Sequence, residues 1–232
     1  TLKAGLQDGE IDDDKIDIVE ESINVSALRP TQNEIDVDKS LSYPLAKDAK
    51  LLKDYLEGKD VVIMAPIITL NGKWVIDGHH RWSQVYAFNA NATMKCADMK
   101  FSGMDPITGL KAVQTAIAAV MGQVPQKFVK GTNLLKASED EVKKDIVALI
   151  NKGSVGITAM KTLKKFNKIK SLDPNEAADY VWQQVAIMQT KAKPATGAPE
   201  RGYMPQTDEP PGKFDDLEKI LKKGVVNWNK PF

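Results

Sequence analysis

The chain has 232 residues, of which 42% are hydrophobic and 27% are charged, and its formal net charge at pH 7 is +1. This composition is ordinary for a globular protein of one or two domains, and no segment approaches the roughly 18 consecutive apolar residues of a membrane span. The single cysteine, Cys96, excludes a disulfide framework and fits a reducing compartment. One cysteine and two adjacent histidines also exclude a zinc cluster.

The net charge conceals an asymmetry along the chain. Residues 1–104 carry 12 Lys and Arg against 17 Asp and Glu, whereas residues 105–232 carry 20 against 14. The split favours two segments with different partners, or else a solvated surface whose charge simply varies. The first residues lack the basic-then-apolar pattern of a secretory signal. We therefore expect the cytoplasm of a bacterium or of a phage-infected cell, or a virion.

The N-terminal part begins with a strongly acidic stretch. Residues 8–21 hold eight acids and one lysine, so we expect 1–20 to form a solvated arm or a frayed helix. Alternating residues predict a strand over 23–28. Apolar residues at helical spacing predict a helix over 45–58, ending at Gly58.

The strongest local signal is a hairpin. Two apolar runs, 66–70 and 73–77, are separated by Asn71-Gly72, the pair typical of a type I′ turn because both central residues need positive φ. A helix over 81–89 and a strand over 92–99 follow.

The elements of residues 21–104, in the order strand, helix, hairpin, helix and strand, indicate a small α+β domain with a mixed sheet.

Residues 105–191 are predicted to form a helical domain, with helices over 106–122, 138–153, 157–170 and 173–191. Ser138 and Glu141 have the spacing of a capping box. Asp173 and Pro174 are typical of the first two positions of a helix.

The C-terminal segment, 192–232, differs in composition. Residues 192–212 hold five prolines and three glycines and are predicted to be an extended linker, followed by a short helix over 213–224. Trp228 and Phe232 are residue types enriched at interfaces, so this segment is a candidate docking arm for a protein partner. The alternative is that the tail folds back onto its own core.

The sequence VIDGHHRW, residues 75–82, contains both histidines and one of only three arginines. Asp77 ends a strand, Gly78 allows a turn, and a helix is expected to start at about His80. Such a helix start binds anions through its N–H groups and dipole, and Arg81 adds a planar cation suited to phosphate oxygens. The stretch from Asp77 through His79 to Arg81 therefore predicts a phosphate-binding loop. The alternative is that these residues only cap the helix and satisfy buried polar groups.

These residues also carry a resemblance to a known family. The run from INVSALRPTQ through APIITLNGKWVIDGHHRW to the following strand resembles the ParB/sulfiredoxin fold, and most closely its phage-encoded ParB-like domains, over roughly residues 20–100. In that family the G-x-x-R loop and the helix start bind nucleotide phosphates. The resemblance implies a nucleotide ligand such as ATP, ADP or CTP, together with Mg²⁺.

Departures from the family pattern separate its activities. Sulfiredoxins have a reactive cysteine where this chain has His79, which excludes sulfinic acid reduction. Chromosomal ParB proteins, which bind CTP, have GERR at this loop. Gly78 and Arg81 match that pattern, but His79 and His80 do not.

The free serine kinases of the fold provide the closest match to DGHHR. Their acidic base lies near the first conserved proline, so the resemblance makes Glu34 or Asp36 the candidate base or Mg²⁺ ligand. His80 would act as a catalytic donor and Arg81 would neutralise charge on a transferred phosphate. Phosphoryl transfer or nucleotide hydrolysis is the activity this implies; the alternative is a polar loop without catalysis.

Two other functions compete with nucleotide binding. A Gly-containing turn precedes a basic helix, as in the helix-turn-helix of ParB proteins, which favours a DNA-binding protein or a ParB-like nuclease. Its lysines suit phosphate contacts rather than base reading, although a solvated face is equally consistent: Lys161, Lys164, Lys165, Lys168 and Lys170. The third hypothesis is a virion structural or interaction protein with a vestigial site.

Overall fold

The computed structural model of the chain describes residues 17–121 and 131–200, with the side chains of 115–121 excepted. These residues form an α+β fold, in agreement with the expected class. The sheet has five strands in the order β1-β5-β3-β4-β2. Their bounds are β1 Asp17–Asn24, β2 Arg29–Pro30, β3 Ile67–Leu70, β4 Trp74–Asp77 and β5 Thr93–Lys100.

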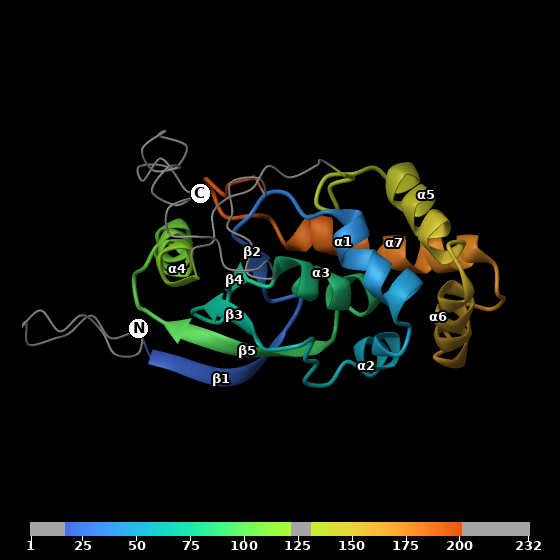
Figure 1. Ribbon diagram of the computed structural model, residues 1–232, viewed down its shortest axis with the longest axis horizontal. Helices are drawn as coiled ribbons and strands as arrows, with labels where there is room; N and C mark the ends of the chain where they lie inside the picture. The colour runs from blue at the N-terminus through green and yellow to red at the C-terminus, as the bar shows by residue number, and fades with distance from the viewer. Residues whose placement is uncertain (1–16, 122–130, 201–232) are drawn as a thin grey trace, which may run out of the picture.

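Helices make up most of the remaining described structure. The first group is α1 Val37–Ser42, the π-helical turn η1 Tyr43–Lys47, α2 Leu51–Glu57 and α3 His79–Phe88. The second group is α4 Pro106–Met121, α5 Glu139–Ile150, α6 Ser154–Lys165 and α7 Pro174–Lys191. In Figure 1 the sheet lies at one end of the molecule and α5 and α6 lie at the other, while α7 runs from that end back toward β2 and α3 lies in the middle. None of the described helices is long and apolar enough to cross a membrane.

The sheet is mixed. β1 pairs antiparallel with β5, and β5 runs parallel to β3. The β3–β4 hairpin is antiparallel, and β4 runs parallel to the two-residue strand β2. This last pairing places the residues after β2 beside the residues after β4.

The predicted hairpin turn is confirmed. Asn71 and Gly72 have φ values of 53° and 66°, and the Lys73 N–H donates to the Leu70 carbonyl at 3.1 Å. Both central residues therefore have the positive φ that a type I′ turn requires. The buried Asp98 carboxylate adds a tertiary clamp, because it accepts the Gly72 N–H at 2.8 Å.

The first strand differs from the prediction. The strand expected over 23–28 is β1, which begins at Asp17, inside the segment expected to be an acidic arm, and ends at Asn24. The Asn24 side chain accepts the Ser26 N–H at 2.8 Å and so turns the chain. An Asx turn of this kind competes with strand pairing, and the alternating pattern did not reveal it. Residues 1–16 lie outside the described structure.

The helix predicted over 45–58 is divided in two. The turn η1 ends at Lys47, Asp48 is extended with φ −146°, and α2 begins at Leu51. The end at Gly58 is confirmed, because Gly58 has φ 70° and its N–H donates to the Asp54 carbonyl.

The helix α1, which precedes this region, was not predicted. Its N-cap is the side chain of Asp36.

One hydrophobic cluster joins the two predicted domains. It contains Trp82, Val85 and Tyr86 of α3 together with α5, α6 and α7 residues such as Ile146 and Val185. Polar bonds add to this packing. The Tyr180 hydroxyl donates to the Phe88 carbonyl, and Arg29 donates to the Lys191 carbonyl at the end of α7 at 2.5 Å. A cation at that end also complements the helix dipole.

Two predicted helix starts of the second half are confirmed. The helix predicted over 157–170 is α6, which begins at Ser154 and ends at Lys165, so Lys168 and Lys170 lie after it. Ser138 and Glu141 form the capping box of α5, and Asp173 caps α7 with Pro174 in its first turn. Each such cap contributes about 1 kcal/mol. The close approach of α5 and α6 requires Gly156, because a Cβ there would lie 1.9 Å from the Ile150 carbonyl oxygen.

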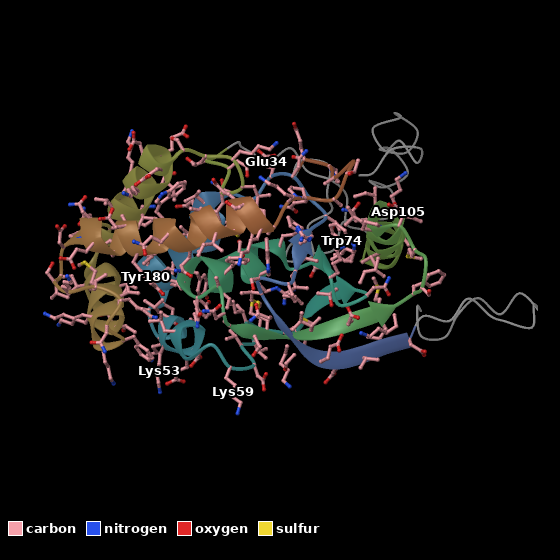
Figure 2. The ribbon with its side chains drawn as sticks, turned by 180° about the vertical axis from the view of Figure 1, so that it is seen from behind. Glu34, Lys53, Lys59, Trp74, Asp105 and Tyr180 are labelled. Atoms are coloured by element: carbon pink, nitrogen blue, oxygen red, sulfur yellow. The ribbon has the colours of Figure 1, made fainter. Side chains whose placement is uncertain are left out.

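The beginning of the predicted linker packs against the domain. The Ala195 N–H donates to the Pro30 carbonyl at 3.0 Å, and the Asn33 N–H donates to the Pro199 carbonyl at 2.9 Å. Ala195 and Ala198 pack with Ile107 of α4 and with Trp74 (Figure 2). Residues 192–200 thus dock on the domain, and a turn at Gly197, closed by the Ala198 N–H donating to the Ala195 carbonyl at 3.0 Å, interrupts the predicted extended segment. The predicted short helix, Trp228 and Phe232 lie outside the described residues.

Candidate functional site

Two motif segments far apart in the sequence meet at the start of α3. The short strand β2 pairs in register with β4, with Arg29 opposite Trp74 and Pro30 opposite Val75. The loop after β2, residues 31–36, therefore lies against the first turn of α3. The LRPTQ and DGHHR motifs are brought into direct contact by this parallel pairing.

His79 is the buried part of this contact. Only 4% of its surface is exposed, and its Nε2 accepts the Thr31 N–H at 3.1 Å. The Thr31 hydroxyl is also buried and donates to the Val75 carbonyl at 2.6 Å. An Nε2 that accepts this bond carries no proton. His79 therefore joins α3 to the loop, and its contact with a phosphate stays a prediction.

His80 forms a second and longer link to the same loop. Its Nε2 accepts the Asp36 N–H at 3.4 Å, and it is half-buried. The backbone of Asp36 thus contacts a histidine of the predicted phosphate loop. The expected catalytic donor and one of the two expected bases are neighbours in space.

The two candidate acids have different surroundings. The Asp36 carboxylate is buried and caps α1 by accepting the Lys39 N–H at 2.7 Å. Desolvation by burial raises its pKa above the usual value, and the hydrogen bond from Lys39 acts in the opposite direction.

Glu34 is half-buried, and its carboxylate forms no hydrogen bond or ion pair with the described part of the chain. Asp36 caps α1, whereas the Glu34 carboxylate makes no such contact within the described residues.

Gly78 shapes the start of α3. It is the N-cap residue and has φ 93°. Because it is a glycine, no side chain at this position caps the helix. The first bond within the helix runs from the Trp82 N–H to the Gly78 carbonyl at 2.9 Å, which places Gly78 at the N-terminal end of α3. A Cβ at position 78 would lie 2.6 Å from Cγ2 of Ile67. Glycine is needed here for both its backbone conformation and its lack of a side chain.

Arg81 is held by protein groups. Its Nη2 pairs with the Asp77 carboxylate at 2.9 Å, and its Nη1 donates to the Ala65 carbonyl at 2.8 Å. The Arg81 side chain is 21% exposed. The guanidinium was expected to be available to phosphate, but here it is bonded to a carboxylate and to the segment before β3. Its Nε–H takes part in none of these bonds.

The donor set for a metal is sparse. Across residues 17–121 and 131–200, no group of three or more His, Cys, Asp or Glu side chains is arranged to hold a metal ion. An Mg²⁺ ion held by one protein carboxylate and by nucleotide phosphates needs no such group. Glu34, just after the LRPTQ motif, and Asp77, within the DGHHR motif, are carboxylates that could provide this single ligand.

Cys96 lies away from this loop, on β5. It is fully buried, and burial raises the pKa of its thiol to about 11. A thiol of this kind is a poor nucleophile at neutral pH.

The basic residues of the second half lie on the surface. Lys161, Lys164 and Lys165 of α6 are exposed and form no ion pair with another described residue. Their spacing places them on one face of the helix. An open pocket of about 440 Å³ follows at the α6–α7 connection, where Lys168 lies 5.7 Å from the ring of Tyr180. Lys170 also lines this pocket.

No protein-family model, curated protein or solved structure matches the chain. The ParB/sulfiredoxin resemblance therefore depends on the motif residues and on their contact in the fold.

Sequence reasoning missed two parts of the site. One is Thr31, although it lies inside the quoted LRPTQ motif. The other is the turn at Met64, which has no glycine or asparagine to signal it.

Proposed function

We propose that the chain is a ParB/sulfiredoxin-type protein that binds a nucleotide phosphate at the start of α3. The observation that carries this proposal is Gly78, an N-cap residue in the left-handed conformation with no capping side chain. A side-chain cap would occupy the N–H groups that an anion uses. The loop of residues 31–36 lies beside this helix start and supports the proposed likeness of the two motifs to that family.

The charge balance of the loop sets the condition for binding. The Asp77–Arg81 ion pair is locally neutral, so the attraction for an anion comes from the helix start, from Arg81 once its guanidinium turns to the phosphate, and from whatever cation accompanies the ligand. Mg²⁺ bound to the nucleotide would lower the net negative charge of the ligand that approaches the Asp77 carboxylate. We therefore expect Mg²⁺-nucleotide complexes to bind more tightly than free nucleotides. Phosphoryl transfer or hydrolysis, with Glu34 as base, is the activity proposed for this site.

Calorimetric titration with ATP, ADP and CTP, each with and without Mg²⁺, tests the proposal. Micromolar binding to the wild type that weakens at least about tenfold in Arg81→Gln is the expected result. His80→Gln serves as a second variant if Arg81→Gln lowers the melting temperature. Lys53→Gln, on α2 and distant from Glu34 in Figure 2, is the control. Absence of heat with all three nucleotides would contradict the proposal.

A second candidate function is nucleic-acid binding through α6. The observation that favours it is the row of exposed lysines on one face, without acidic partners among the described residues. Lysine contacts to phosphates give affinity without sequence preference. The adjoining pocket, with Lys168, Lys170 and Tyr180, would extend this surface.

Fluorescence anisotropy with a labelled duplex and a single strand of equal length, each at several salt concentrations, tests this second function. Replacing Lys161, Lys164 and Lys165 together by alanine should reduce the slope of log affinity against log salt by about 2 to 3. The control replaces Lys50, Lys53 and Lys59, which lie in or beside α2. An equal effect of the two triple variants would remove α6 as the binding surface.

A further inference from the structure

A strained turn lies next to the proposed phosphate loop. The Ala65 N–H donates to the Ile63 carbonyl at 2.7 Å, which closes a three-residue γ-turn, and the central residue Met64 has φ 63°. A γ-turn with positive φ is rare and strained, and methionine has no preference for this conformation. The Met64 side chain is 97% exposed, so its own packing does not stabilise the turn.

Arg81 is the group that stabilises the turn. Its Nη1 donates to the Ala65 carbonyl at 2.8 Å and lies 3.4 Å from the Ile63 carbonyl, so it contacts both ends of the turn. Its Nη2 is held by Asp77 at 2.9 Å. One guanidinium thus joins the turn to the residue that precedes Gly78. Lysine could not make these contacts together, because it is a point donor on a flexible stem.

We propose that residues 63–65 form a latch that Arg81 holds closed and that an anion bound at the start of α3 opens. This inference rests on the proposed phosphate site. The planar guanidinium forms its strongest bonds with phosphate oxygens, and those bonds compete with the carbonyl bonds that it now makes. Once Arg81 turns toward a phosphate, the turn at Met64 loses its support and relaxes to an unstrained backbone.

The Arg81 guanidinium lies close to Gly78 and so needs to move only a short distance between the turn and a bound phosphate. A Cβ at position 78 would lie 3.0 Å from Nη2 of Arg81, so the guanidinium already borders the helix start. A change of side-chain torsions, without movement of α3, would transfer the guanidinium from the carbonyls to a bound phosphate. The exposed side chains of Val62 and Met64 would then change position, which links ligand binding to a surface feature.

Amide hydrogen exchange, measured by mass spectrometry on the peptide that contains residues 62–65, tests the latch. In the wild type, saturating Mg²⁺-nucleotide should speed exchange at Ala65 by about tenfold. In Arg81→Lys, exchange at Ala65 should already be fast without nucleotide and should not respond to it. Lys53→Gln should behave as the wild type does. Calorimetry on the same samples reports binding independently.

The outcomes separate the latch from the phosphate site. Nucleotide binding with unchanged exchange at Ala65 would overturn the latch and leave the proposed function standing. Slow exchange in Arg81→Lys would also overturn it, because Arg81 would then not hold the turn. Absence of binding would overturn both. Binding with faster exchange in the wild type, and a fast, unresponsive turn in Arg81→Lys, is the result that supports the latch.

Discussion

The start of α3 and the exposed face of α6 carry the two groups of polar residues proposed to have a function, and they differ in how those residues are satisfied. At α3, His79 is buried against Thr31, and Arg81 is bonded to Asp77 and Ala65. On α6, Lys161 and Lys164 are exposed and have no ion pair with a described residue. The polar residues that lie close together in the sequence at 77–81 are therefore residues whose bonds join parts of the fold. The side chains most exposed to a ligand are instead the lysines of α6, a residue type that is frequent on helix surfaces.

The comparison teaches that the polar groups of a proposed binding motif can also bond to the protein itself, as those of His79 and Arg81 do. His79 and Arg81 fix the loop of residues 31–36 and the turn at Met64 around the helix start. The start of α3, with Gly78 at its N-cap, is the feature proposed to bind a phosphate. Substitutions that disturb the α3 region should therefore cost much more stability than those on α6.

The largest effect is expected at Gly78. Gly78→Ala forces a Cβ to within 2.6 Å of Ile67 at a φ of 93° and should lower the free energy of unfolding by about 2–4 kcal/mol. Gly103→Ala is the matched control. Gly103 has φ 80° but nothing within 4 Å of its added Cβ, so it should lose only about 1 kcal/mol. Urea denaturation of both variants gives the comparison, and equal losses would show that the close contact at position 78 is unimportant.

The next largest effect is expected at Thr31. Thr31→Val removes the buried hydroxyl that donates to the Val75 carbonyl and should cost about 1–3 kcal/mol. Thr158→Val, on the exposed surface of α6, removes a hydroxyl that donates to the Ser154 carbonyl and should change stability by less than about 0.5 kcal/mol. Thermal and urea unfolding measure both. A loss in Thr158→Val as large as that in Thr31→Val would break the contrast between the two regions.

A smaller, pH-dependent effect is expected at Asp36. Because burial raises its folded-state pKa, its ionisation lowers stability as the pH rises from the unfolded value of 3.8 through the folded value. Asp36→Asn removes that charge and keeps a cap for α1, so its stability relative to the wild type should improve between pH 4 and pH 7, by less than about 1 kcal/mol. Denaturation at three pH values measures this difference. Asp38→Asn, at an exposed neighbour, is the control, and a relative loss of stability in Asp36→Asn as the pH rises would refute the prediction.

The smallest effect on stability is expected on α6. Alanine at Lys161, Lys164 and Lys165 together should leave the melting temperature nearly unchanged, because surface substitutions without partners fall within about 0.5 kcal/mol each. A loss of several degrees would mean that the lysine stems contribute to packing. The α6 face would then resemble the α3 region, and its availability to a ligand would be in doubt.

Local patterns in the sequence predicted those elements whose conformation depends on a few neighbouring residues. The Asn71-Gly72 turn, the end of α2 at Gly58, the capping box of Ser138 and the α7 start at Asp173 all form as expected. Each is a short-range requirement for positive φ or for a capping oxygen. The α+β class follows from these elements and from the apolar periods between them.

Longer-range features could not be predicted in this way. The start of β1 depends on pairing with β5, and α1 depends on its cap at Asp36 and on packing against α3. The start of β1 has no strong local signal. Asp36 is a typical N-cap residue, but α1 has only six residues and is too short to show an apolar period. The docking of residues 195–199 beside Pro30 and Asn33 also depends on partners more than 160 positions away in the chain.

For the site, the sequence by itself identified the helix start, the need for glycine at position 78 and the polar residues around it. Only the tertiary structure decided what those residues do. The parallel pairing of β2 with β4 buries His79 against Thr31, and the Ala65 carbonyl at the end of the Met64 turn accepts a hydrogen bond from Arg81. Residue type sets which bonds a side chain is able to make, whereas burial and the position of distant backbone groups decide which bonds it makes.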